Sequence, residues 1–227
     1  MSKTHMTKRD ARRAARARQR LYTRIITAGI IIAILAAATW LVVTTQKAKP
    51  AATTELVGTK QYSAAPSMLI DVTKQYFAKV KMAKGGEFVI QLYPDKAPIT
   101  VNSFVFLAHQ GYFNGVTFHR VLEGFMAQGG DPTGTGSGGP GYTFANEAND
   151  MKFDKAGVVA MANSGTDTNG SQFFIMFGPY GLSESDYTIF GQVIEGMDMV
   201  NAITLRDPNT NPDYPGDAIE SITITEK

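Results

Sequence analysis

The chain has 227 residues, of which 44% are hydrophobic and 19% are charged, a composition typical of globular proteins. It contains no cysteine, which excludes disulfides, cysteine zinc sites and thiol catalysis. The formal net charge of +2 conceals two parts of opposite sign. The first 24 residues hold nine lysines and arginines and one acid, whereas the rest of the chain carries more acidic than basic residues.

Residues 25–45 form an uncharged, hydrophobic segment directly after this basic stretch. The segment has about the 20 residues that a helix needs to cross a bilayer, and Trp40 lies near its end, where an indole suits the membrane interface. A cleaved signal peptide is the alternative, but its hydrophobic region would be shorter, about 7–15 residues. We therefore predict a single transmembrane helix that holds the chain in a lipid bilayer.

The positive-inside rule sets the orientation of this span. Residues 1–24 would be a basic cytoplasmic tail, and everything after the span would face the outside of the cytoplasmic membrane. A neighbouring membrane anchor also argues against nucleic-acid binding by the tail. Residues 46–66 are rich in alanine, threonine and lysine without hydrophobic periodicity, which predicts a flexible linker. The globular domain then spans 67–227, with residues 68–71 as a short lead-in that docks on it.

A β-hairpin is predicted at the start of this domain. Residues 76–82 and 87–93 alternate between hydrophobic and polar side chains, and Lys84-Gly85-Gly86 supplies the turn. Pro98 then stands where a helix can begin, and hydrophobic residues follow at helical spacing. Gly111 is placed to end that helix.

The later hydrophobic stretches are short and bounded by glycine, which indicates strands. These strands are predicted at 157–162, 172–177, 187–194 and 218–225. A second, short helix is predicted at 196–204. Many short strands with two helices predict a mainly β fold, a closed antiparallel barrel capped by two helices.

The stretch VTFHRVLEGFMAQGGD, residues 116–131, places an arginine among hydrophobic residues. In a strand, Val116, Phe118 and Arg120 would share one face. Arginine stays charged in proteins, so it is costly on an apolar face unless a polar group meets it; an ion pair with a carboxylate is the plain structural alternative. The following aromatic, thioether and amide side chains instead favour an apolar pocket with a few fixed polar groups.

The second informative stretch is GVVAMANSGTDTNGSQFF, residues 157–174. It ends in adjacent Phe173 and Phe174, which must face opposite sides of a strand, one toward the core and one toward a second surface. Together the two stretches resemble the signature of the cyclophilins, the cyclosporin-binding peptidyl-prolyl cis-trans isomerases. The resemblance extends from Tyr76 to the C-terminus and implies an eight-stranded barrel with two helices.

The resemblance also implies a function and a site. It makes Arg120 the catalytic residue in the rotation of X–Pro peptide bonds, with proline-containing unfolded or folding polypeptides as substrates and no cofactor or metal. The proline pocket is implied to consist of Phe125, Met126 and Phe174. The groove for the peptide backbone is implied to consist of Gln128, Ala162, Asn163 and Gln172. The alternative is a non-catalytic chaperone module that binds proline peptides.

The loop after the second stretch departs from the family pattern. Many cyclophilins carry a tryptophan and then a histidine there. Counting back from Phe190-Gly191, the histidine position falls on Tyr187 and the tryptophan position near Leu182. The resemblance therefore implies that Leu182 and Tyr187 line the groove and that cyclosporin binding is weak.

Two other patterns have structural explanations. Residues 134–139 match Gly-x-Gly-x-x-Gly, but Pro140 follows where a helix should start and no βαβ unit is present, so a shaped loop beside the pocket is predicted instead of a dinucleotide site. His119 adjoins Arg120 but would point to the opposite face of the strand. No set of residues is spaced to bind a metal with it.

Overall fold

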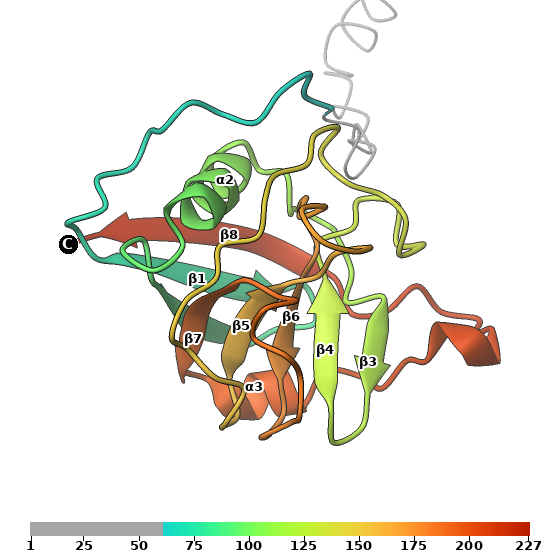
Figure 1. Ribbon diagram of the computed structural model, residues 1–227. Helices are drawn as coiled ribbons and strands as arrows, with labels where there is room; N and C mark the ends of the chain where they lie inside the picture. The colour runs from blue at the N-terminus through green and yellow to red at the C-terminus, as the bar shows by residue number, and fades with distance from the viewer. Residues whose placement is uncertain (1–60) are drawn as a thin grey trace, which may run out of the picture. The chain divides into compact units, whose positions relative to one another are not determined.

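The computed structural model describes residues 61–227, which form one eight-stranded antiparallel sheet with two helices (Figure 1). The strands are β1 (Tyr76–Met82), β2 (Glu87–Leu92), β3 (Arg120–Leu122), β4 (Met126–Gly129), β5 (Val158–Met161), β6 (Phe173–Met176), β7 (Ile189–Glu195) and β8 (Ile219–Glu226). They follow the order β3-β4-β6-β5-β7-β2-β1-β8. The helices are α2 (Pro98–His109), α3 (Met197–Asn201) and the 3₁₀ turn η1 (Pro208–Thr210).

The predicted cytoplasmic tail and the predicted transmembrane helix at 25–45 lie outside the described residues. Within residues 61–227, no helix combines the length and the hydrophobicity needed to cross a membrane. The predicted lead-in is found docked on α2, because the Leu69 amide donates to the Asn102 side-chain oxygen at 2.7 Å.

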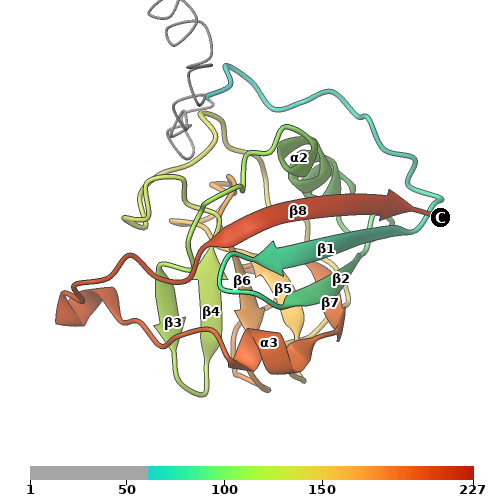
Figure 2. The same ribbon diagram turned by 180° about the vertical axis from the view of Figure 1, so that it is seen from behind.

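The predicted hairpin is confirmed as β1 and β2, which pair with Tyr76 opposite Leu92. Both strands alternate between buried and exposed positions, so one face of each points into the core. The turn contains Gly86 at φ +85°, a left-handed conformation that favours glycine, and the Met82 amide donates to the Gly86 carbonyl at 3.0 Å. Figure 2 shows β8, β1 and β2 side by side along this part of the sheet.

The predicted first helix is confirmed as α2, which begins at Pro98 and packs against β8. Its N-terminus has no side-chain cap of its own; instead the Glu147 carboxylate accepts hydrogen bonds from the amides of Ile99 and Thr100 at 2.9 and 2.8 Å. This satisfies free N–H groups and places a negative charge where the helix dipole favours it. Gly111, at φ +62°, follows the end of the helix as expected.

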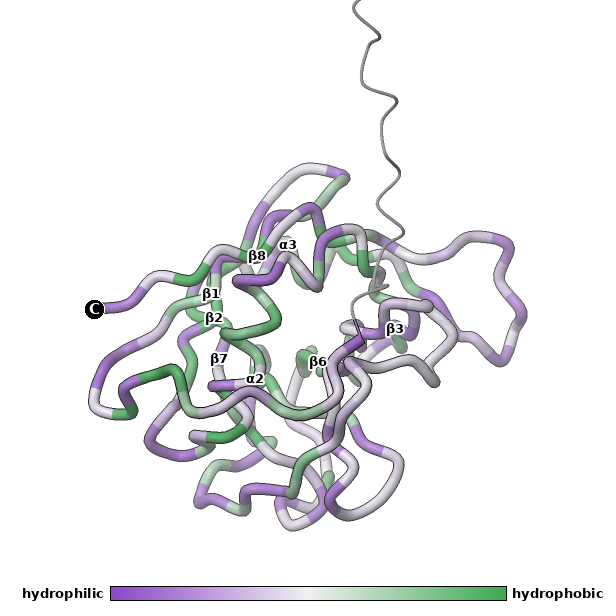
Figure 3. Tube along the Cα trace, turned by 90° about the horizontal axis from the view of Figure 1, so that it is seen from above, coloured by the Kyte–Doolittle hydropathy of each residue, from purple (hydrophilic) through white to green (hydrophobic). Residues whose placement is uncertain are grey.

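The sheet has two hydrophobic faces, and β6 shows both. Phe173 and Ile175 belong to the large interior cluster, while Phe174 and Met176 belong to a smaller cluster on the outer face. The prediction that adjacent phenylalanines face opposite sides is confirmed. Hydrophobic residues recur along the strands that surround the interior in Figure 3. We call the smaller set the outer cluster; its buried members are Met126, Phe153, Val158, Ala160, Phe174, Met176 and Ile189.

The prediction of a closed barrel is wrong, because the sheet is open between its end strands β3 and β8. Irregular segments take up the free edges of both strands. Val121 in β3 exchanges two backbone hydrogen bonds with Arg206, at 2.7 and 2.9 Å. At the start of β8, Ile219 accepts from Gly115 at 2.7 Å and donates to Val116 at 2.9 Å. The fold is therefore a half-barrel whose gap is bridged by loops.

The strand predicted from Val116 is shorter than expected, since β3 begins only at Arg120. Phe118 lies in the interior cluster, whereas Arg120 lies on the outer side beside Met126, so the two do not share a face. The Phe118 amide donates to the Asp217 carbonyl at 2.9 Å, outside any regular ladder. This irregular pairing breaks the alternation just before Arg120.

The remaining predicted elements are confirmed with shifted ends. The predicted second helix at 196–204 is only the five-residue α3, and the later strands each differ from the predicted ranges by a few residues. The strand β4 was not predicted. Its sequence, MAQG, contains a polar residue and a glycine in four positions, so it lacks a readable alternation.

Candidate active site

A cleft of about 170 Å³ lies on the outer face of the sheet, where β3, β4, β5 and β6 meet. Nine of the ten predicted site residues line it, although they are spread over the 68 positions from Arg120 to Tyr187. They are Arg120, Phe125, Met126, Gln128, Ala162, Asn163, Phe174, Leu182 and Tyr187.

Arg120 is the cation of this cleft and remains half-buried. Its Nη1 lies 3.4 Å from Gln128 Oε1 and 3.9 Å from Met126 Sδ, and its guanidinium carbon is 5.8 Å from the centre of the Phe125 ring. None of the five ion pairs within residues 61–227 includes Arg120. The alternative of a structural arginine paired with a carboxylate is therefore wrong.

The apolar wall of the cleft is built from stacked side chains. Met126 and Phe174 are buried, and Phe174 stacks on Phe153 at 5.9 Å between ring centres. Tyr187 meets Phe174 edge-on at 5.5 Å. Phe125 is half-buried. These contacts hold flat apolar surfaces around a space open to solvent, which suits a small apolar ring.

Another part of the rim comes from the loop 178–188, which carries Leu182 and Tyr187. Asn163 ties this loop down, because its side-chain Nδ2 donates to the Asp186 carbonyl at 2.8 Å. Tyr180 lies on the same loop and stacks on Phe125, with 4.2 Å between ring centres. The loop is thus attached to both sides of the cleft.

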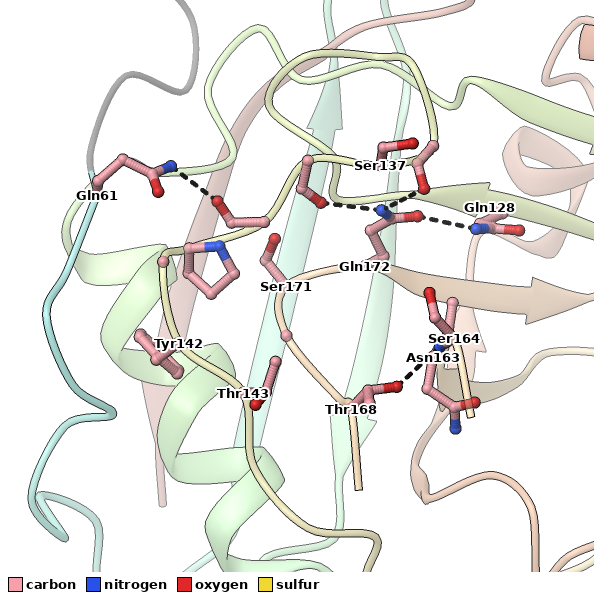
Figure 4. A pocket seen from close by; sticks show the side chains of 17 residues that line it. Gln61, Gln128, Ser137, Tyr142, Thr143, Asn163, Ser164, Thr168, Ser171 and Gln172 are labelled. Carbon is pink, nitrogen blue, oxygen red and sulfur yellow. Dashed lines mark hydrogen bonds between the residues drawn. The ribbon is translucent and has the colours of Figure 1, made fainter. Parts of the chain in front are cut away.

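Gln172 is the one predicted site residue that does not line this cleft. It lines a neighbouring, larger cleft of about 610 Å³, shown in Figure 4. Its Oε1 accepts from Gln128 at 2.9 Å, and its Nε2 donates to the carbonyls of Gly136 and Gly138 at 3.0 and 2.9 Å. Gln128, Ala162 and Asn163 line both clefts, so the two form one continuous groove.

The glycine-rich loop 134–143 forms a wall of the larger cleft, as the sequence predicted for a shaped loop. Asp131 anchors its first half by accepting hydrogen bonds from the amides of Thr133, Gly136 and Gly138 at 2.7, 2.6 and 3.1 Å. Burial by itself would raise the pKa of Asp131, but these hydrogen bonds outweigh burial and lower it. The carboxylate is therefore a stable charged anchor for the loop.

The sequence did not identify Gln61, which lines the groove, or Asp131 and Tyr180, which support it. Asp131 had a readable signal, since Asp-Pro-Thr-Gly favours a turn in which the Asp side chain accepts backbone hydrogen bonds. Tyr180 and Gln61 had none, because an aromatic residue in a loop and an amide before the domain are ordinary. Only the fold brings them to the groove.

The chemistry available in the smaller cleft is narrow. No carboxylate, imidazole or thiol lines it, so its side chains offer no group suited to proton transfer or nucleophilic attack near neutral pH. Within residues 61–227 no three metal-ligating side chains are gathered either. What remains is a fixed cationic donor beside an apolar pocket. This half-barrel and cleft define a protein of cyclophilin type.

Comparisons with known proteins agree with this class. Residues 77–224 match a family model described as cyclophilin type peptidyl-prolyl cis-trans isomerase. The human peptidyl-prolyl cis-trans isomerase-like 1 is 47% identical over 141 residues, which cover 60% of this chain and 84% of that protein. The peptidyl-prolyl cis-trans isomerase A of Mycobacterium tuberculosis is 47% identical over 161 residues, covering 62% of this chain and 87% of that one.

Solved structures give the same result. A cyclophilin type peptidyl-prolyl cis-trans isomerase of Cryptosporidium parvum is 31% identical, with a TM-score of 0.61, covering 67% of this chain and 99% of its own. Its structure in the presence of the dipeptide Ala-Pro gives a TM-score of 0.60 at 31% identity, covering 66% of this chain and 99% of that one. The chain belongs to the cyclophilin-type peptidyl-prolyl cis-trans isomerase family and is an enzyme of that class.

Proposed function

We propose that this isomerase acts outside the cytoplasmic membrane, where it accelerates rotation of X–Pro bonds in folding proteins, and that Arg120 is its catalytic residue. The observation that carries the role of Arg120 is its environment. It is a half-buried guanidinium with no carboxylate partner within residues 61–227, and it stands at the edge of an apolar pocket. A cation in that position is available to a substrate.

The reaction requires no bond to break. Amide resonance gives the peptide bond a rotation barrier of about 18–20 kcal/mol, and resonance is lost in the twisted state, where the prolyl nitrogen gains a lone pair. A donor directed at that lone pair stabilises the twisted state and neither planar state, which is the requirement for catalysis. Arg120 can supply this donor permanently, because its guanidinium does not deprotonate in proteins.

The other residues of the cleft would hold the substrate in place for this step. Phe125, Met126 and Phe174 offer the apolar surfaces for the proline ring. Gln128 accepts from Arg120 and so orients the guanidinium. The peptide backbone on either side of the proline would follow Ala162 and Asn163 toward the larger cleft. The Ala-Pro dipeptide present with the Cryptosporidium protein agrees with a substrate of this kind.

A non-catalytic chaperone that binds proline peptides would use the same pocket but would not need the arginine. The two functions are separated by measuring cis–trans exchange in a proline peptide by NMR. The isomerase should accelerate exchange at enzyme concentrations far below that of the peptide. Binding without acceleration would favour the chaperone alternative.

The membrane location is a proposal from the sequence. An uncharged segment at 25–45 follows nine cationic residues, which favours a single-pass anchor with the N-terminus in the cytoplasm and the isomerase domain outside. The predicted linker 46–66 would serve as the tether as far as residue 60, since Gln61 and Tyr62 are hydrogen-bonded to the domain. The clients would be extracytoplasmic polypeptides. Protease added to spheroplasts should remove the domain and spare the N-terminal tail. A protected domain would contradict this topology.

A further inference from the structure

Gln61 and Tyr62, the first two described residues, are hydrogen-bonded to the glycine-rich loop of the larger cleft. Figure 4 shows Gln61 beside this loop. Gln61 Nε2 donates to the Gly139 carbonyl at 2.8 Å, and the Tyr62 amide donates to the Pro140 carbonyl at 2.8 Å. We call this pair the 61–62 strap. The family match begins only at residue 77, so the strap comes from outside the family domain.

The strap is fitted closely to its position. The Tyr62 ring packs edge-on against Phe106 of α2, at 5.0 Å between ring centres, and against Tyr142 at 6.4 Å. Gly141 has φ +90°, and a Cβ at this position would lie 2.6 Å from the Tyr62 carbonyl oxygen. A side chain at residue 141 would therefore collide with the strap as well as strain the backbone.

The strap and two side chains of the domain hold different parts of the glycine-rich loop. Asp131 and Gln172 hold the loop from Gly136 to Gly138. Among the described residues, the hydrogen bonds to the carbonyls of Gly139 and Pro140 come from the strap. Gln61 also lines the larger cleft directly, opposite Asn163 and Thr168 in Figure 4.

The larger cleft has the character of a binding surface for uncharged groups. Its lining consists of amides, hydroxyls, glycines, one proline, one alanine and one tyrosine, with no charged side chain. A charged substrate side chain would lose water there without gaining a partner of opposite charge, whereas a polar side chain or an extended backbone would find donors and acceptors. The cleft joins the proline pocket through Gln128, Ala162 and Asn163, so it faces residues close to the proline.

We propose that the 61–62 strap determines specificity: it fixes the wall from Gly139 to Gly141 and adds Gln61 to the surface that binds uncharged substrate residues near the proline. The inference rests on the isomerase function proposed above. The chain segment that precedes the family domain would then take part in substrate binding.

The test compares a short and a long substrate on the full-length protein in detergent micelles. The short substrate is a capped Ala-Pro dipeptide, which reaches only the proline pocket. The long substrate carries the same dipeptide with three uncharged polar residues on each side. Cis–trans exchange of each is followed by NMR, and kcat and KM are obtained for wild type and Gln61→Ala.

Gln61→Ala should raise KM for the long peptide by roughly twofold to tenfold, the effect of one uncharged hydrogen bond, with kcat unchanged. The short peptide should be converted as by the wild type. Gln75→Ala is the matched control, because Gln75 is exposed, also precedes β1 and does not line the groove.

Equal KM values for wild type and Gln61→Ala on the long peptide would overturn the proposal. So would an equal loss on both peptides, because that pattern indicates a general structural effect. The wild-type rate on the short peptide is measured in the same experiment. If that rate is absent, the proposed isomerase function fails; if it is present, only the role of the strap is in question.

Discussion

Both faces of β5 and β6 carry hydrophobic residues, but the two faces meet different surroundings. On the interior face, Phe173 is fully buried and meets three other phenylalanine rings edge-on, at 5.6, 5.9 and 6.1 Å. On the outer face, Phe174 is buried by one stacked ring and one edge-on ring and still lines an open cleft. A sealed face contributes to stability, whereas an incompletely covered face leaves apolar area for a ligand.

The two arginines of the described chain show a similar contrast between a side chain that is fully engaged and one that remains accessible. Arg206 is engaged by the backbone: its Nε donates to the Tyr214 carbonyl at 2.8 Å, and its Nη1 donates to the His119 carbonyl. Arg120 makes only long contacts, at 3.4 and 3.9 Å. One arginine therefore bridges loops near the open edge of the sheet, and the other remains available at the apolar cleft. The comparison predicts that stability resides on one face and activity on the other.

The largest expected effect separates the adjacent phenylalanines. Phe173→Ala should lower the free energy of unfolding by about 3–5 kcal/mol, because it leaves a cavity inside the closed cluster. Phe174→Ala should cost less stability, since its space opens to the cleft, but should raise KM for a proline peptide. Denaturant unfolding and steady-state kinetics on both variants check this. Equal stability losses with unchanged KM in Phe174→Ala would break the comparison.

A smaller effect is expected at the rim of the cleft. Leu182 is half-buried against the outer cluster, and a tryptophan there would add apolar area and an N–H donor. Leu182→Trp should therefore tighten inhibition by cyclosporin about tenfold, roughly 1.4 kcal/mol. Leu205→Trp, at an exposed position away from the cleft, is the control. If the unaltered protein is already inhibited as tightly as a tryptophan-bearing cyclophilin, the assignment of Leu182 is wrong.

The smallest effect concerns pH and the buried side chain of His119. Burial lowers the pKa of His119 below its usual value of 6.5. Below pH 6.5 the unfolded chain takes up a proton on His119 more readily than the folded chain does. Protonation therefore favours unfolding, so the stability that neutral His119 contributes is present above pH 6.5 and is lost as the pH falls.

The melting temperature of the wild type should therefore fall between pH 7.5 and 5.5, and His119→Gln should flatten that fall. His109→Gln, which removes an exposed histidine at the end of α2, provides the reference slope. Isomerase activity should change little over the same range wherever the protein stays folded, because no imidazole or carboxylate lines the cleft. An unchanged slope in His119→Gln would contradict the assignment to His119.

The sequence predicted most of the regular structure, because its signals are local. Alternation marked β1 and β2, Pro98 marked the start of α2, and the parity of Phe173 and Phe174 correctly placed them on opposite faces. The site residues were named through their resemblance to a family, and the fold brings nine of the ten to one cleft. Local patterns alone would have suggested a pocket but not its members.

The parts that the sequence missed depend on contacts between distant segments. The prediction of a closed barrel was wrong because the free edge of β3 pairs with Arg206 and the free edge of β8 pairs with the chain before β3. Local sequence patterns do not indicate which distant segments will pair. The irregular pairing of residues 115–118 with the chain at the start of β8 also broke the expected alternation between Phe118 and Arg120. Gln61 could not be assigned to the groove, because its partner Gly139 lies 78 residues away.

The most direct test of the central claim is the replacement of Arg120, the available cation on the incompletely covered face. Arg120→Ala should lower kcat for a proline peptide by about 10²–10³-fold, the usual effect of removing one preorganised donor, with a smaller change in KM. Arg120→Lys should recover little, because a single ammonium does not reproduce the planar fork of donors. The free energy of unfolding should change by no more than about 0.5 kcal/mol, as for a surface substitution. Near-normal turnover in Arg120→Ala would contradict the account, and so would loss of the fold in that variant.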